Sequence, residues 1–450
     1  MPESPGATLA YNLAGSVPAG PVTADVLRLT LADAIARGLE HNLAVVAAVQ
    51  QERTIAGERL GVESNLMPQM SVAAYSATLS EDLDALGFNP SFLKKLGIPA
   101  SLAPGIIKTD YTGAQLNVQQ QLFNGQAVVL LRAARAENDA AHLDMLNARG
   151  AVVEAVGAEY LQELAAEAEA QNAEALLRAD KAAFEQAQAR HQAGVATGLD
   201  ELRAEVQMQT QEQAAVSAEN ALVKTRMALN RMIGLAPEQA VDLTDAAPYA
   251  ELAMLPLSEA EATAYAHRKD FLSLEAHLHA AQLELRATAW ERMPSLSAGG
   301  FYGVMGQTES LYHGVFSAGG TLTFPLFREA QLRGEREAAA ANLASLRERD
   351  ADLRASIRIQ LRDAQMDVAA AAALVKSADA ALELARQELE DVGMRYAAGV
   401  DDNLPVVRAQ AQLAAAHSAH VNALYQYNVA KLRLAQATGV VESQYANYLH

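Results

Sequence analysis

Histidines, acidic residues and glycines are the side chains of this sequence that could support chemistry, and their spacing gives little sign of a reaction centre. There are no cysteines, which excludes disulfides, thiolate metal sites and cysteine nucleophiles. The sequence contains no Gly-x-x-x-x-Gly-Lys loop, His-Glu-x-x-His pair or Gly-x-Ser-x-Gly elbow. His417 and His420 lie three residues apart, which a solvated helix face explains better than a metal site. We therefore predict no enzyme, no metal and no cofactor.

The composition predicts a large helical protein with a packed core. Of its 450 residues, 51% are hydrophobic but only 5% are aromatic. The net charge of −19 disfavours binding to nucleic acid phosphates. The longest apolar run, Val368–Val375, has eight residues, fewer than the roughly 18 that a membrane-spanning helix needs. Residues 1–28 hold four prolines without the basic and apolar regions of a secretory signal, so we expect an extended N-terminal arm there.

The chain contains an internal repeat. Leu29-Thr30-Leu31 resembles Leu255-Pro256-Leu257, and Ala193-Gly194-Val195 matches Ala398-Gly399-Val400. The offset, which is the difference in residue number between matching residues, stays constant over a long stretch for each match. A constant offset indicates a duplicated structural unit. We call two residues equivalent when they are related by the first offset (Leu29 to Leu255) or by the second (Gly194 to Gly399). The sequence therefore predicts a first repeat over residues 29–240, a linker or equatorial segment over 241–255, a second repeat over 256–441 and a C-terminal tail over 442–450.

Each half predicts the same order of elements: helix, strand pair, long helix, turn, helix. Proline-free stretches rich in Ala, Leu, Glu, Gln and Arg predict the helices, and glycines such as Gly194 mark their ends. The predicted helices are 33–66, 126–192 and 200–233, with Asp200 as an N-cap, and then 258–293, 329–397 and 405–438. The predicted strand pairs lie within 68–123 and 294–327, and residues 81–110 are expected to form a long outer loop with a short amphipathic helix.

The predicted helix lengths fit together. A helix over residues 126–192 would be about 100 Å long. The two shorter helices of the first half, placed end to end, match that length, and the second half shows the same relation. Each half is therefore expected to pair one continuous helix with one split helix. The strands would lie at one end and the Gly-Val turns at the other, which gives four strands, two ~100 Å helices and four shorter helices per chain.

Two of the predicted strands alternate between apolar and polar residues, as a strand with one apolar face does. Their length of about ten residues suits a tilted strand in an outer-membrane bilayer. Four strands cannot close a barrel and would leave open edges, whereas three copies would supply twelve strands. On the apolar face we predict six lipid-facing side chains: Leu116, Val118, Leu122, Phe316, Leu322 and Phe324.

Loose motifs follow one another along the chain: Leu-Thr-Leu-x-x-Ala-Ile at 29–35, Met67-Pro68, Arg-x-x-Ala-Gly-Val at 190–195, Phe-Pro-Leu-Phe at 324–327, and Arg-x-x-Ala-Gly-Val again at 395–400. In this order they resemble the TolC-like outer-membrane efflux proteins, the outer membrane factors. The resemblance implies a mostly α fold with a small β part, assembled as a homotrimer. In it, a 12-stranded transmembrane β-barrel continues into a 12-helix periplasmic α-barrel.

The same resemblance implies a location in the bacterial outer membrane with a periplasmic extension. It implies an exit duct of a tripartite efflux or type I secretion system, which passively conducts small molecules or proteins. The partners would be a periplasmic adaptor, an inner-membrane pump and outer-membrane lipid. Residues 241–255 would form a belt around the tunnel.

Particular residues take roles only by this resemblance. The tip turns that dock the adaptor would be Ala193, Gly194, Val195, Ala398, Gly399 and Val400. A periplasmic aperture would be lined by Asp200, Tyr396, Asp401, Asp402 and Arg408. Pro405 and Arg408 stand where the family places aspartates, so its closed-state salt bridges do not transfer. Arg408 would either change the aperture or pair with an acid such as Asp402 or Asp200. Helix capping alone is the alternative explanation of the turns and of Asp200.

A second interpretation stays open on the sequence. The strand pairs could serve oligomerisation in a soluble coiled-coil scaffold without channel activity. Gln120, which falls on the apolar face of its strand, and the modest hydrophobicity of the strands favour that scaffold. The repeat, the strand alternation and the motif order together favour the outer-membrane duct.

Overall fold

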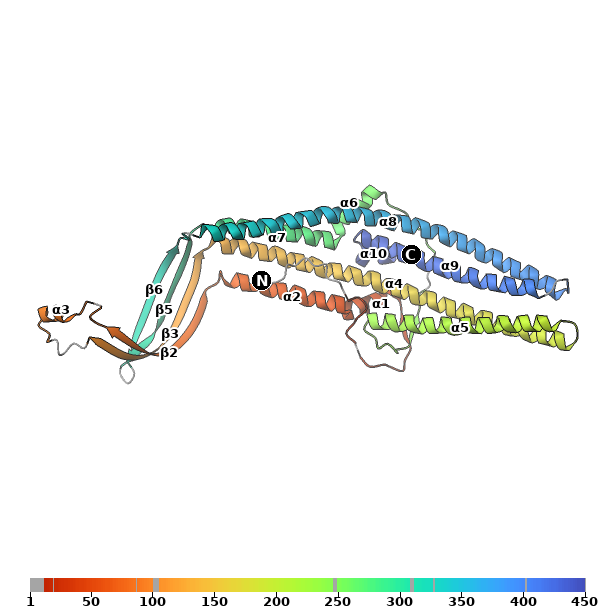
Figure 1. The fold of residues 1–450 in the computed structure, drawn as a ribbon, viewed down its shortest axis with the longest axis horizontal. Helices are drawn as coiled ribbons and strands as arrows, with labels where there is room; N and C mark the ends of the chain where they lie inside the picture. The colour runs from red at the N-terminus through yellow and green to blue at the C-terminus, as the bar shows by residue number, and fades with distance from the viewer. Residues whose placement is uncertain are drawn as a thin grey trace. The chain divides into compact units, whose positions relative to one another are not determined.

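The computed structural model describes residues 12–18, 20–85, 87–99, 105–245, 249–307, 311–326, 328–400 and 403–449. The chain divides into two compact units. The sheet unit comprises Thr54–Asn138 and Ala276–Arg347, and the helical unit comprises Met1–Arg53, Asp139–Glu275 and Glu348–His450. Figure 1 shows the order of the elements. In the ranges just given, no helix combines the length and the apolar character needed to cross a membrane.

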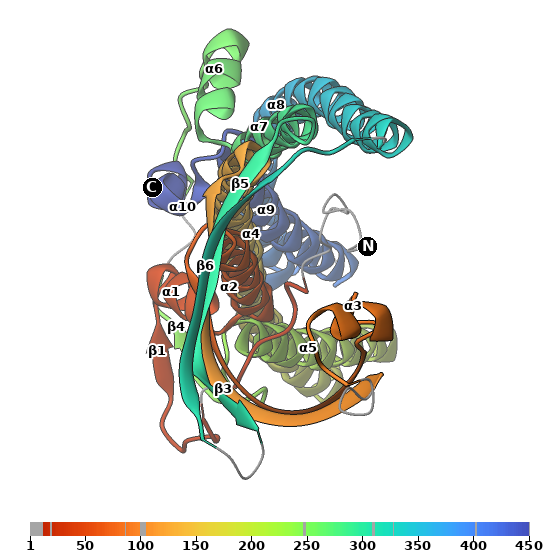
Figure 2. The same ribbon diagram turned by 90° about the vertical axis from the view of Figure 1, so that its left-hand side faces the viewer.

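The sheet unit contains one antiparallel sheet with the strand order β2, β3, β5, β6. The strands are β2 (Gln69–Asp82), β3 (Ile106–Phe123), β5 (Ser295–Gln307) and β6 (His313–Thr323). Both predicted strand pairs are present, and Figure 2 shows that the sheet is curved.

The predicted outer loop over 81–110 is shorter than expected. β2 and β3 stay paired as far as Asp82 and Ile106, because Ile, Thr and Tyr residues favour extended backbone at the start of β3. The expected short helix is α3 (Pro90–Lys95), where the side chain of Asn89 accepts from the amide of Phe92 at 3.0 Å. Residues 86 and 100–104 lie outside the described part of the chain.

The helices of the sheet unit meet through small side chains. Buried Val129, Ala133 and Ala136 of α4 (Gly125–Gln192) pack against buried residues of α7 (Lys269–Trp290). Those α7 residues are Ala280, Leu283 and Ala287. Because alanine is short, it lets two helix backbones approach closely, which accounts for the alanine-rich composition.

Four helices dominate the helical unit: α4, α5 (Gly198–Met232), α8 (Glu329–Ala397) and α9 (Leu404–Ala437). α4 and α8 have 68 and 69 residues and agree with the predicted long helices to within one residue at each end. The predicted helices 33–66 and 258–293 are each two helices. They are α1 (Leu31–His41) with α2 (Leu43–Ser64), and α6 (Leu257–His267) with α7.

The two helix breaks fall at Asn42 and Arg268, which are equivalent residues of the repeat and both have extended backbone. The amide of Asn42 is buried and donates to the carbonyl oxygens of Leu13 at 2.7 Å and Met232 at 3.1 Å. The guanidinium of Arg268 donates to the carboxylate of Asp270 at 2.6 and 3.0 Å. At each break a side-chain oxygen accepts from a backbone amide: Oδ1 of Asn42 from Ala44 at 3.0 Å, and Oδ1 of Asp270 from Phe271 at 2.8 Å. These bonds replace helical ones, which is why a continuous helix was the wrong prediction there.

Two cores lie in the helical unit. Tyr160, Leu229 and Ile233 lie in the first core, and Ile357, Leu361 and Leu434 lie in the second. The first core also contains Val429 and Leu432 of α9. Two features around these cores were not predicted. β1 (Leu27–Leu29) pairs in parallel with β4 (Val241–Leu243), and the expected C-terminal tail is a helix, α10 (Val441–Leu449), which packs on α9. Three-residue strands are too short to show a periodic pattern.

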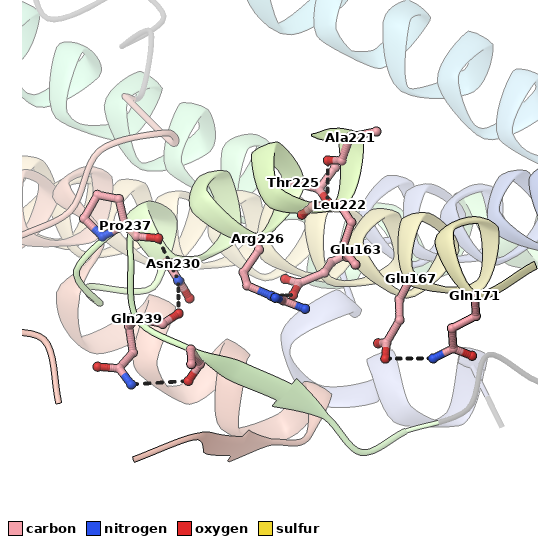
Figure 3. Close-up of polar contacts among 11 residues, drawn as sticks. Glu163, Glu167, Gln171, Ala221, Leu222, Thr225, Arg226, Asn230, Pro237 and Gln239 are labelled. Atoms are coloured by element: carbon pink, nitrogen blue, oxygen red, sulfur yellow. Dashed lines mark hydrogen bonds and ion pairs between the residues drawn. The ribbon is translucent and has the colours of Figure 1, made fainter. Parts of the chain in front are cut away.

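A buried ion pair joins α4 to α5 in the first repeat (Figure 3). The guanidinium of Arg226 donates to the carboxylate of Glu163 at 3.1 Å, and Glu163 is fully buried. Burial raises the pKa of Glu163, and Arg226 opposes that rise. Beyond the pair, the amide of Asn230 donates to the carbonyl oxygens of Pro237 at 3.1 Å and Gln239 at 2.8 Å, which fixes the chain after α5.

Candidate functional site

The turns after α4 and α8 are built alike (Figure 1). In the first, the amide of Gly194 donates to the carbonyl of His191 at 2.9 Å, and the amide of Val195 donates to the carbonyl of Arg190 at 3.0 Å. The second turn repeats both bonds at the equivalent residues, each at 3.1 Å. This pair of bonds is the Schellman motif, which satisfies carbonyls at the end of a helix.

Glycine is required at both turns by the backbone. Gly194 has φ of 73° and Gly399 has φ of 72°, the left-handed region that residues with a Cβ disfavour. No atom lies within 4 Å of where a Cβ would stand on either glycine, and the neighbouring Val195 and Val400 are exposed. Each turn therefore exposes an apolar side chain and has open space beside its glycine, so the backbone of another chain could approach it closely.

Two contacts bring the turns together in the helical unit. The guanidinium of Arg190 lies over the ring of Tyr396 at 4.7 Å, a cation–π contact. The buried amide of Asn403 donates to the carbonyl of Asp200 at 3.5 Å. Tyr396 and Asp200, two of the predicted aperture residues, therefore lie at the point where the helix pairs α4–α5 and α8–α9 meet.

Asp200 is the third residue of α5 and the acidic member of a capping box, so its prediction as the N-cap was wrong by three residues. Thr197 is the N-cap, and its amide and hydroxyl donate to the carboxylate of Asp200 at 3.0 and 2.7 Å. The hydrogen bond from the Thr197 side chain lowers the pKa of Asp200. The carboxylate of Asp200 thus accepts hydrogen bonds that stabilise the start of α5. Its role in an aperture stays a prediction.

A histidine–carboxylate contact across the first turn was missed by the sequence analysis. Nδ1 of His191 lies 2.5 Å from the carboxylate of Glu201, to which the amide of Gln188 also donates at 3.3 Å. The hydrogen bond from His191 lowers the pKa of Glu201. The signal that could have shown it is the position of each residue, since one ends α4 and the other begins α5.

The second turn lacks this polar clamp. At the positions equivalent to Asp200 and Glu201 stand Pro405 and Val406. Arg408, predicted for the aperture, is exposed in α9. Asp401 and Asp402 lie outside the described residues, so the pairing of Arg408 with Asp402 stays open. The carboxylate of Asp200 is engaged by Thr197, with Arg203 3.9 Å away.

Apolar side chains form rows across the curved sheet. One row of partners crosses all four strands through Val72, Leu116, Tyr302 and Phe316, and each of these side chains is exposed. In the adjacent row, Gln115 is less exposed, and its amide donates to the carboxamide of Asn117 at 2.9 Å. Leu322 is exposed near the end of β6, whereas Phe324 lies just after the strand.

Within β3 the apolar side chains lie on one face of the sheet and the amides of Gln115, Asn117 and Gln119 lie on the other. Leu116, Val118, Leu122, Phe316, Leu322 and Phe324 are all exposed, at fractions between 36% and 78%. Leu116, Val118, Phe316 and Leu322 share one face by register, whereas Leu122 lies at the register shift of β3 and Phe324 follows β6. An apolar solvent such as lipid is the environment that suits the exposed apolar side chains of that face.

The two histidines of α9, His417 and His420, lie in different surroundings. Across the described ranges, no group of three or more His, Cys, Asp or Glu side chains is placed to hold a metal ion. Burial lowers the pKa of His417, and His420 lies 3.8 Å from the carboxylate of Asp379. The expected solvated face is therefore correct only in part, because His417 is half-buried.

A two-repeat helical chain with long helix pairs, glycine turns and a four-stranded sheet with an apolar open face has the architecture of a TolC-like outer-membrane channel. The chain belongs to the outer membrane efflux protein family, whose model matches residues 35–235 and 262–440. No curated protein matches the sequence. Membership confirms the expected family and the location in the bacterial outer membrane.

Solved structures share the fold at low sequence identity. A membrane protein from Pseudomonas aeruginosa is 20% identical with a TM-score of 0.77, covering 91% of this chain and 93% of its own. The outer membrane channel CmeC from Campylobacter jejuni is 16% identical with a TM-score of 0.76, covering 91% and 86%. The outer membrane protein VceC from Vibrio cholerae is 19% identical with a TM-score of 0.74, covering 91% and 96%.

Proposed function

We propose that three copies of this chain form an exit duct in the outer membrane, which passively conducts small molecules or proteins delivered by an inner-membrane pump through a periplasmic adaptor. The observation that carries the proposal is the set of apolar rows on an open sheet face. Such a face needs lipid on its outside.

The ends of the sheet support a closed ring of copies. β2 and β6 are its edge strands, and an unpaired edge is a template for another chain. β6 of one copy would pair with β2 of the next, a head-to-tail contact that closes when the rotation fits. Three copies would then form a 12-stranded transmembrane barrel.

The helical unit has matching open edges. α5 exposes apolar side chains at spacings of four, seven or ten residues, and these spacings place them on one helix face. They are Leu202, Val206, Val216, Val223 and Met227. α8 also exposes large apolar side chains, among them Ile359, Met366, Leu374, Leu384 and Met394. We expect α5 of one copy to pack on α8 of its neighbour, which would close a 12-helix barrel in the periplasm.

The Gly-Val turns are the proposed adaptor-docking tips. Their support is the paired Schellman geometry, the exposure of Val195 and Val400, and the open space around the two glycines. Asp200, Tyr396 and Arg408 would border the aperture beside them. The clamp between His191 and Glu201 holds only the first tip, so the second would be the one that moves on opening.

Light scattering in detergent tests the assembly. The chain has a mass of 47.8 kDa, so a trimer would have a protein mass of about 143 kDa, three times that value, with a detergent belt counted separately. A monodisperse species that needs no detergent would overturn the duct and support the soluble scaffold.

Docking is tested with tip variants in the same trimer. Replacing Gly194 or Gly399 by tryptophan should abolish adaptor binding and export without changing the trimer mass. The matched control is Gly393→Trp, because Gly393 lies six residues before Gly399 in α8 with no atom within 4 Å of a Cβ. Export that survives both tip changes would show that the adaptor docks elsewhere.

A further inference from the structure

The second repeat contains a pocket that the first repeat fills. Its volume is about 210 Å³, and it lies in the helical unit between the segment before α6 and helices α6, α8, α9 and α10. Most of its lining is apolar. The residues used below are Leu252, Leu255, Gln365, Leu434, Thr438 and Tyr448.

The internal repeat identifies what stands in this place in the first half. Gln365 is equivalent to Tyr160, and Thr438 is equivalent to Ile233. Tyr160 is 1% exposed and Ile233 is fully buried, both within the first core. A phenol ring and a branched aliphatic side chain thus occupy the space that a shorter amide and a hydroxyl leave open in the second repeat.

The polar anchor of that space is the same in both halves. The hydroxyl of Tyr160 donates to the carbonyl of Leu29 at 3.1 Å. The amide of Gln365 donates to the carbonyl of Leu255 at 2.8 Å, and Leu255 is the equivalent of Leu29. The two side chains therefore start from matching helix positions and reach matching carbonyls, but only Tyr160 brings an aromatic ring.

Different elements cover the two sites. After α5 the chain forms β4, whose Leu243 packs on the first core. In the second half α10 covers the site instead, and its Tyr448 lines the pocket with its hydroxyl 3.5 Å from that of Thr438. The second site thus has apolar walls and a hydroxyl- and amide-bearing rim, as small-molecule pockets have.

We propose that this pocket binds one small phenol per chain, with the ring where the first repeat holds that of Tyr160 and the hydroxyl toward Gln365 and Tyr448. A dry apolar cavity of about 150 Å³ accepts benzene, so a 210 Å³ pocket has room for one substituted ring. A larger ligand does not fit, since drug-sized molecules need about 300 Å³ or more.

The test uses 4-fluorophenol and the full-length protein in detergent, with binding followed by fluorine NMR. We expect one saturable site per chain. Thr438→Ile and Gln365→Tyr, which restore the residues of the first repeat, should each weaken binding by roughly tenfold or more. Native and filled variants carry the same detergent, so partition of the phenol into micelles cancels in the comparison. Fluorobenzene, which lacks the hydroxyl, should bind more weakly.

A mirror experiment opens the first repeat. Tyr160→Gln should lower the thermal midpoint of the protein, and 4-fluorophenol should restore part of the loss beyond its effect on the native chain. Absence of saturable binding to the native protein would overturn the proposal, as would equal binding to Thr438→Ile. If Gln365→Tyr does not assemble, Thr438→Ile alone decides.

Discussion

Two equivalent cations, one in each repeat, have different partners. Replacing each by methionine should therefore change the stability of the protein in opposite directions. Arg226 in α5 and Lys431 in α9 are equivalent residues. Arg226 pairs with buried Glu163 (Figure 3), whereas the residue at the acid's position in the second repeat is Val368. Lys431 is fully buried, and its partners are the carbonyl of Ala250 at 3.4 Å and the ring of Tyr427 at 4.8 Å.

The magnitude follows from the pKa of the lysine. Burial lowers the pKa of Lys431 from its ordinary 10.5 to about 8, which corresponds to about 3 kcal/mol against the charged form at pH 7. Because the pKa in the folded state lies below that of the unfolded chain, the unfolded chain binds more protons between pH 8 and 10.5. The free energy of unfolding therefore rises with pH across this window.

Lys431→Met keeps the apolar stem and removes the charge, so it should stabilise the protein by about 2–3 kcal/mol at pH 7. Arg226→Met should destabilise it by about 3–5 kcal/mol, because it leaves Glu163 buried without its partner. In thermal melts followed by helical circular dichroism in detergent, we expect the two midpoints to move in opposite directions at pH 7. The gain of Lys431→Met should shrink towards zero by pH 10.

One result would refute this reasoning. If Lys431→Met lowers the midpoint at pH 7, the contacts of the ammonium with Ala250 and Tyr427 outweigh the cost of its burial. A gain that is the same at pH 7 and pH 10 would show that packing, rather than charge, explains the change. Arg226→Met controls for the size of the substitution, since both variants place methionine at matching positions of the repeat.

Local pattern was enough to predict the long helices, the strands and the tip turns. α4 and α8 contain no proline and end at glycine, and these signals depend only on neighbouring residues. The strands alternate with a period of two, so the exposed face of Leu116 and Phe316 could be predicted before their partners were known. The constant offsets then required the same order of elements in both halves.

The predictions that were wrong or missing depend on distant partners. Asn42 breaks a helix because it reaches Leu13 and Met232, 190 residues away in the latter case. A helix-period pattern carries no record of such contacts. The parallel pair of β1 with β4 arises in the same way, through residues that the fold brings together. His191 and Glu201 are the exception, since they are only ten residues apart on either side of a turn, and their positions at the ends of two helices could have shown the contact.

Three further predictions test the tips and the sheet. Gly399→Ala should destabilise the helical unit by about 1–2 kcal/mol through backbone strain, while Gly393→Ala, in an open helical site, should stabilise it by up to about 1 kcal/mol; equal effects in melts would show that φ at the turn relaxes. Thr197→Ala should cost about 1 kcal/mol through loss of the cap, again measured by melting, and an unchanged midpoint would mean that the capping box adds nothing. The last concerns the faces of β3. Leu116→Arg puts a cation on the open apolar face, at a cost of about 2–4 kcal/mol per chain in lipid, and a trimer has three such sites. Gln115→Arg adds the same side chain one residue away on the polar face, where water would solvate it. We expect outer-membrane fractions to contain trimer for Gln115→Arg and not for Leu116→Arg. Assembly of both variants would mean that lipid does not cover the apolar rows, and the proposed barrel would fail with it.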